Sequence, residues 1–148
     1  MESLSSPSEI SLSQATAVIE GAVAKARALG LKPLSVAVVD AGGHLIAFQR
    51  ADGSPTLRPA IAIGKAAAAV GLGVASRKAG EMAAERPHFI GAINHLAPNG
   101  LVPVAGGVNA VDAAGRVIGA VGVSGDTSDN DEAAALAGIA AAGLMAQG

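Results

Sequence analysis

Residues 34–49 read LSVAVVDAGGHLIAFQ, and this stretch predicts a β-hairpin. The run from Leu34 to Val39 is short and rich in β-branched residues, residues 40–43 supply an Asp/Gly turn, and His44 to Gln49 form a second short run. Two such runs on either side of a turn are typical of an antiparallel strand pair. Because parallel strands would each need a crossover connection, the hairpin favours an antiparallel sheet.

A second hairpin is predicted further along the chain, where residues 111–118 read VDAAGRVI and echo VDAGGHLI at residues 39–46. In both turns we expect the Asp carboxylate to cap the turn and the last Gly to adopt a left-handed conformation. Equivalent tight turns recruit equivalent residues, so the echo does not require a gene duplication.

Helical patterns surround the two hairpins. Ser11 and Gln14 have capping-box spacing, and apolar residues then recur at helical spacing as far as Gly30. Further helices are predicted over residues 58–72, 76–85 and 88–96, and a last one begins with Asp129 and Glu132 and continues through residues 133–145.

This order of elements predicts an α+β fold with one antiparallel sheet covered by helices and a ligand pocket between the sheet and the inserted helices. We expect residues 1–10 to form a flexible N-terminal segment and residues 11–148 to form a single domain.

Composition narrows the classes of partner. Of the 148 residues, 51% are hydrophobic and 15% are charged, so the chain can bury a core but leaves a poorly charged surface, which favours a homo-oligomer. The net charge of -2 disfavours nucleic acid and anionic membranes as partners, and the absence of Trp and Tyr disfavours stacking on bases. The absence of Cys excludes disulfides and thiolate chemistry. No stretch is long enough to span a bilayer, and the first residues lack the layout of a secretory signal, so we expect a cytoplasmic protein.

Three motifs match known functional patterns only in part. Gly119, Gly122 and Gly125 match neither a dinucleotide fingerprint nor a phosphate loop, and we expect them to serve close packing. Ser124 lacks the spacer of a hydrolase nucleophile elbow. The acidic stretch from Asp126 lacks the Gly and the final Glu of a calcium-binding loop.

The histidines are the only candidate nitrogen ligands for a transition metal or heme iron. His44 follows a turn, where an exposed polar residue is normal. His88 and His95 are the better candidates, because they lie in an apolar stretch that either lines a pocket or belongs to the core. Their spacing of seven residues places them about 10.5 Å apart along a helix, too far to chelate one ion together.

The densest charged cluster contains Arg50, Asp52, Arg58 and Lys65. It is either a charged rim or a set of groups in which Arg50, Arg58 or Lys65 fixes a carboxylate or a heme propionate, since guanidinium and ammonium groups supply charge-assisted donors.

Five segments together resemble the GlcG/HbpS family of heme-binding proteins, which is related to the PduO C-terminal domain. In chain order they are VAVVDAGG (36–43), RADG (50–53), IAIGKA (61–66), GGV (106–108) and VIGAVGVSG (117–125). The resemblance extends from about Ser11 to Gly143. It implies a profilin-like fold with a five-stranded antiparallel sheet, frequent homo-oligomers, and members that bind or degrade heme. The residues at family-pattern positions are Arg50, Asp52, Lys65, Gly106, Gly107, Ser124 and Asp131.

Three functions follow. The leading hypothesis is a binding protein for heme or a related tetrapyrrole, with iron near His88 or His95 and with ligand-binding residues Arg50, Arg58, Lys65, His88, His95, Gly106, Gly107 and Ser124. The second is an enzyme acting on a small carboxylated metabolite, in which Asp52, Lys65, His88 or Asp131 transfers a proton. The third is an oligomeric accessory module without a ligand. The sequence alone leaves open whether the protein is an enzyme.

Overall fold

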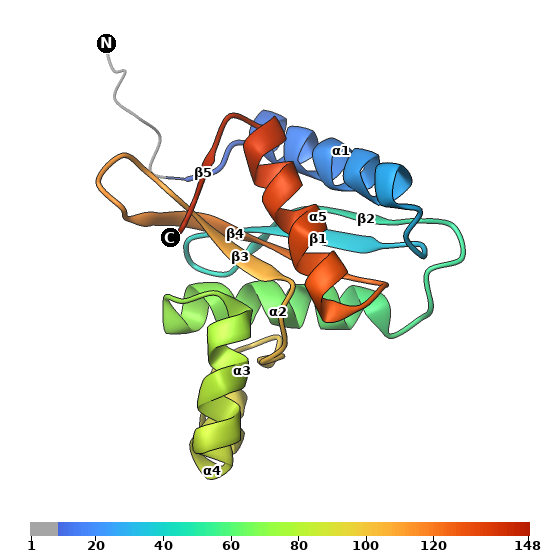
Figure 1. Ribbon diagram of the computed structural model, residues 1–148. Coiled ribbons are helices and arrows are strands. Elements are labelled where there is room, and N and C mark those ends of the chain that lie inside the picture. The colour runs from blue at the N-terminus through green and yellow to red at the C-terminus, as the bar shows by residue number, and fades with distance from the viewer. Residues whose placement is uncertain (1–8) are drawn as a thin grey trace.

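The computed structural model describes residues 9–148, which form a five-stranded antiparallel sheet with helices on both faces (Figure 1). Every neighbouring pair of strands is antiparallel. The spatial order of the strands is β2 (Leu45–Arg50), β1 (Ser35–Asp40), β4 (Val117–Ser124), β3 (Gly107–Val111) and β5 (Met145–Ala146). This architecture confirms the predicted α+β fold and the five-stranded sheet that the family resemblance implies.

The helices divide between the two faces of the sheet. α1 (Leu12–Leu29) and α5 (Ser128–Ala141) pack together on one face, and α2 (Arg58–Leu72) covers the other. α3 (Ser76–Glu85), α4 (Pro87–Ile93) and the short 3-10 helix η1 (Asn94–Leu96) extend away from the sheet as an arm (Figure 1).

The start of the first helix is as predicted. The backbone N–H of Gln14 donates to the Ser11 hydroxyl at 3.1 Å, and the backbone N–H of Ser11 donates to the Gln14 side chain at 2.9 Å, which completes a capping box. Ile10, just before this cap, is buried and its N–H donates to the Ile118 carbonyl. Residues 1–8 of the predicted flexible segment lie outside the described residues, and the division at residue 10 stays a prediction.

The last helix differs from the prediction at both ends. Its N-cap is Thr127, whose hydroxyl accepts from the Asn130 N–H at 3.3 Å, so the helix begins at Ser128 rather than at Asp129 as predicted. The helix ends at Ala141 rather than continuing to Met145. Gly143 adopts a left-handed φ of +72°, and the following residues pair with β3 as β5.

The two hairpin turns form as predicted. Oδ1 of Asp40 accepts the N–H groups of Gly42 and His44, each at 2.9 Å. Oδ1 of Asp112 accepts the corresponding N–H groups of the second turn, also at 2.9 Å each. Gly43 and Gly115 have left-handed φ values of +85° and +84°, conformations that glycine adopts without strain.

The two faces of the sheet carry side chains of different size. Valines on β1, β3 and β4 point into the larger core, which α1 and α5 complete. On the opposite face Ala120 and Gly122 leave room for the backbone of α2. A Cβ atom added to Gly122 would overlap the Ala62 carbonyl, and one added to Gly119 would lie 2.5 Å from the Val39 carbonyl oxygen. These contacts confirm that the glycines of this motif serve close packing.

Among residues 9–148 no single helix has both the length and the apolar character needed to cross a membrane. α2 and α3 meet that test only as a pair, and the two helices are bent by 79° where they join.

Candidate functional site

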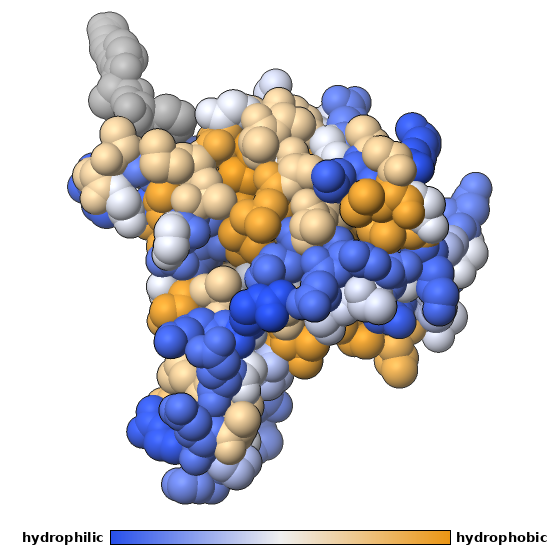
Figure 2. Space-filling view, in the orientation of Figure 1, coloured by the Kyte–Doolittle hydropathy of each residue, from blue (hydrophilic) through white to orange (hydrophobic). Residues whose placement is uncertain are grey.

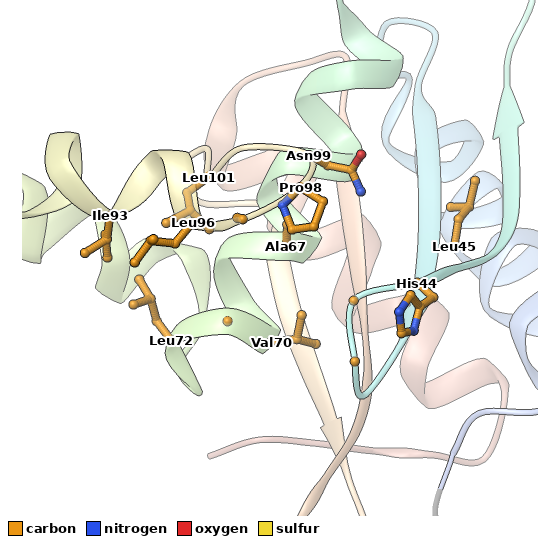
Figure 3. Close-up of a pocket in the computed structure, with 14 residues that line it drawn as sticks. His44, Leu45, Ala67, Val70, Leu72, Ile93, Leu96, Pro98, Asn99 and Leu101 are labelled. Atoms are coloured by element: carbon orange, nitrogen blue, oxygen red, sulfur yellow. The ribbon is translucent and has the colours of Figure 1, made fainter.

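Two cavities bear on the predicted site residues, and the larger of these, about 570 Å³, lies between the β1–β2 turn, the C-terminal half of α2 and residues 93–101 (Figure 3). Ligand pockets in proteins are typically about 300–1,000 Å³ and largely apolar. Most side chains in this lining are aliphatic, among them Leu45, Val70, Leu72, Ile93, Leu96 and Leu101. The only polar side chains in the lining are His44, from the turn, and Asn99, from the segment after η1. The cavity is therefore suited to an apolar ligand that meets one imidazole and one amide.

The imidazole of His44 is 82% exposed, like the rings of the other two histidines, and it pairs with a carboxylate of its own turn. Nδ1 of His44 lies 3.1 Å and 3.2 Å from the two carboxylate oxygens of Asp40. Burial raises the pKa of Asp40, but hydrogen bonds from the backbone N–H groups of His44 and Gly42 and from the His44 ring outweigh that effect and lower it. Asp40 is therefore ionised near neutral pH, and Nε2 is the ring nitrogen of His44 that this pairing leaves available.

The other two histidines lie on the arm. His88 in α4 and His95 in η1 are both exposed, and neither lines the cavity, although Ile93 and Leu96 from the same stretch do. Within the described part of the chain, no three His, Asp or Glu side chains gather closely enough to hold a metal ion. A metal-binding role for His88 and His95 stays a prediction.

Lys65 and Asp131 form a buried ion pair between α2 and α5. Their side chains are 3% and 1% exposed, and Nζ of Lys65 lies 3.1 Å from Oδ2 of Asp131. The ammonium also donates to the Val123 carbonyl at 2.9 Å. Burial lowers the pKa of Lys65, the nearby charge of Arg58 lowers it further, and Asp131 opposes the shift. The pair ties α2 to β4 and to the first turn of α5.

Two of the remaining charged candidates, Arg58 and Arg50, also have partners within the fold. Arg58 donates to the Ser124 hydroxyl at 3.1 Å, and Arg50 donates through Nε to the Ser54 carbonyl at 3.0 Å. Asp52 lines the smaller cavity, about 280 Å³, beside the C-terminal end of α1. The structure thus joins Arg58 to Ser124 and Lys65 to Asp131, while Asp52 lies apart.

Gly106 and Gly107 make room for Lys65. A Cβ atom on Gly106 would lie 2.8 Å from Nζ of Lys65, and one on Gly107 would overlap the Lys65 carbonyl. Neither these glycines nor the predicted charged residues line the larger cavity. Their predicted catalytic and ligand-binding roles stay predictions, and the geometry gives them contacts that stabilise the fold.

The sequence predicted an exposed His44, which the structure confirms, but it did not predict that the turn carrying His44 borders the cavity. The turn's neighbours in space come from residues 67–72 and 93–101, which no periodic pattern relates to it. The one sequence feature that could have drawn attention to His44 is a difference between the two similar turns. The first turn carries His44 where the second carries Arg116.

Comparisons with known proteins cover nearly the whole chain. A family model described as "Haem degrading protein HbpS-like" matches residues 10–140. The crystal structure of HbpS is 30% identical, with a TM-score of 0.79, and the match covers 93% of this chain and 92% of that one. The structure of a PduOC:heme complex is 25% identical, with a TM-score of 0.82 over 95% and 99% of the two chains.

A third structure shows the shared fold alone. ORFY from Klebsiella pneumoniae is 24% identical, with a TM-score of 0.82 over 97% of each chain. A comparison with curated proteins found no match.

Proposed function

Because the chain belongs to the HbpS-like family, which confirms the resemblance seen in the sequence, we propose that it binds heme or a related tetrapyrrole in the larger cavity. Family membership supports a ligand of this class, and so does the likeness to a chain solved as a heme complex. The observation that carries the proposal is an apolar cavity of about 570 Å³ with an imidazole at its rim, where the His44 side chain is 82% exposed.

The residues of the cavity fit part of a tetrapyrrole well. Aliphatic side chains from α2 and residues 93–101 would cover an apolar macrocycle and remove its surface from water. Nε2 of His44 would hold the iron, since a histidine is a common axial ligand of heme. Bound heme would supply a redox-active, ligand-binding iron. No Arg or Lys lines the cavity, so Arg50, Arg58 and Lys65, which we predicted to bind the propionates, are not among its walls.

A binding role is better supported than an enzymatic one. Two of the predicted proton-transfer residues, Lys65 and Asp131, bind each other in the interior, and neither reaches the cavity. The apolar lining instead offers contact area, which stabilises a bound ligand through burial of apolar surface.

A hemin titration followed by absorbance tests the proposal. The wild-type protein should give a saturable, stoichiometric Soret band, and His44→Ala should weaken binding roughly 10-fold or more. His88→Ala and His95→Ala are matched controls on the arm and should leave the titration unchanged.

The outcomes separate the alternatives. Absorbance that never saturates with the wild-type protein would refute heme binding. A band that His88→Ala or His95→Ala weakens, and that His44→Ala does not, would move the iron ligand from the turn to the arm, as the sequence predicted.

The proposal includes a cytoplasmic homo-oligomer. Large apolar side chains are exposed over the described surface, including Leu12, Leu57, Leu96 and Met145. Figure 2 shows apolar residues spread over the upper helical layer of the view, whereas the visible side of the arm is mainly hydrophilic. The apolar residues give a second copy a surface to cover. A solution mass of a multiple of 14.2 kDa by light scattering would support the oligomer, and a mass of 14.2 kDa would refute it.

A further inference from the structure

The two hairpin turns provide an internal comparison. The first reads DAGGH over residues 40–44, and the second reads DAAGR over residues 112–116. Both have an Asp that accepts two backbone N–H groups and a glycine with left-handed φ at the fourth position. The two turns differ only at the third and fifth positions, where Gly42 and His44 replace the Ala114 and Arg116 of the second turn.

The turn itself does not require glycine at its third position. Ala114 donates its N–H to Oδ1 of Asp112 at 2.9 Å, and Gly42 makes the same bond to Asp40 at the same distance. Gly42 is also not among the glycines with positive φ, so its backbone conformation is open to other residues. The reason for glycine at this position must lie outside the backbone of the turn.

The imidazole of His44 lies where a side chain at residue 42 would be. A Cβ atom added to Gly42 would lie 2.8 Å from Cε1 and 3.0 Å from Nδ1 of His44. Such contacts are shorter than non-bonded carbon atoms normally allow. A side chain at residue 42 would therefore displace the exposed ring from this position over the turn. In the second turn Arg116 reaches Asp112 through Nε at 3.1 Å with Ala114 in place.

Asp40 completes the arrangement from the other side. Its carboxylate is already fixed by two backbone N–H groups, so it presents an immobile acceptor to Nδ1 of His44. A carboxylate accepts only, so the proton of a neutral ring resides on Nδ1, and the lone pair resides on Nε2. The same carboxylate–histidine pairing orients histidine ligands in many metal sites.

We propose that Gly42 and Asp40 are positioning residues that hold His44 as its Nδ1–H tautomer, with the Nε2 lone pair available to a metal-centred ligand in the cavity. The ligand part rests on the proposed function. The tautomer of the His44 ring in the ligand-free protein does not depend on the proposed function, so the tautomer and the ligand binding can be tested separately.

The test is ¹⁵N NMR of the histidine rings in the ligand-free protein, at a pH where the imidazoles are neutral. We expect the ¹⁵N shifts of His44 to show a protonated Nδ1 and a bare Nε2, with His88 and His95 as internal references. Gly42→Ala should shift His44 toward the tautomer mixture of the references. Ala114→Gly, the matched change in the second turn, should leave all three rings unchanged.

A second variant shows whether the turn survives. Gly42→Ala combined with His44→Arg recreates the residues of the second turn, so this double variant should recover any melting temperature that Gly42→Ala alone loses. A His44 ring with the same tautomer ratio as the references, or one unaffected by Gly42→Ala, overturns the proposal. Failure of the double variant to recover the melting temperature overturns the assignment of Gly42 to the ring.

Hemin is the probe for the ligand. If Nε2 coordinates iron, Gly42→Ala should weaken hemin binding roughly 10- to 100-fold, the usual effect of losing a residue that orients a metal ligand. Ala114→Gly should not alter it. Unaltered binding by Gly42→Ala overturns the ligand part. No saturable binding by the wild type would instead refute the proposed function, and the NMR result would still decide the state of the ring.

Discussion

Replacing Lys65 with Met should strongly destabilise the fold, because it leaves Asp131 as a buried charge without its cation. Met keeps the length and the apolar stem of Lys, so little volume is lost. The change removes an ammonium that lies 3.1 Å from Asp131, whose side chain is 1% exposed, and it removes the donor to the Val123 carbonyl. Breaking a buried pair in this way costs about 3–5 kcal/mol.

This cost translates into a large change in thermal stability. For a domain of this size, about 1 kcal/mol corresponds to roughly 2–4 °C in Tm, so Lys65→Met should lower Tm by roughly 6–20 °C. Thermal unfolding followed by far-UV circular dichroism measures this directly. Adding Asp131→Asn to Lys65→Met removes the isolated charge and should recover part of the loss.

The exposed cluster in which Arg77 pairs with both Glu132 and Asp129 is the matched control. Nη2 of Arg77 lies 3.1 Å from Oε1 of Glu132, but the side chain of Arg77 is 46% exposed, so Arg77→Met should cost only about 0–1 kcal/mol. If Lys65→Met changed Tm no more than Arg77→Met does, the interior pair would not be an important source of stability, and the reasoning would be refuted.

Three further outcomes are expected. Gly122→Ala should cost about 1–3 kcal/mol by urea unfolding, since its Cβ would overlap the Ala62 carbonyl, and a neutral effect would contradict the close packing of α2. Asp126 accepts three N–H groups, first among them the side-chain amide of Asn130, and these hydrogen bonds lower its pKa from 3.8 to about 2. Asp126→Asn should therefore be less stable than wild type at neutral pH, and the difference in Tm should disappear as the pH falls from 3.8 to about 2. A difference in Tm that stays constant over this pH range would contradict the reasoning. Gln147→Ala removes the donor to the Gly73 carbonyl and should cost about 0.5–1.5 kcal/mol by the same urea assay, whereas no change would show that water replaces the bond.

The parts of the fold that local chemistry determines were predictable from the sequence. The Asp/Gly turns, the Ser11 cap and the bounds of α2 follow from neighbouring residues, and the structure confirms them. β5 was not predictable as a strand, because Met145 and Ala146 are too few to show a periodic pattern. They pair with β3 only because Gly143 reverses the chain after α5.

The candidate site was predictable only in part. Ile93 and Leu96 line the cavity, as the apolar stretch suggested, but His88 and His95 are exposed elsewhere on the arm. The turn that carries His44 lies beside α2, where Gly43 and Val70 line the same cavity. These two residues are 27 positions apart in the chain, and no local rule relates them.

The tight seating of α2 on the sheet has a consequence for hydrogen exchange. The helix from Ala62 to Ala69 is almost wholly buried, and its backbone rests on glycines of β3 and β4. Its amide protons should therefore exchange with deuterium only when the whole molecule opens. The amides of residues 93–101, on the opposite wall of the cavity, belong to a segment without fully buried residues and should exchange by local opening orders of magnitude sooner. The wall formed by α2 would then stay closed during the time in which the wall formed by residues 93–101 opens and closes many times.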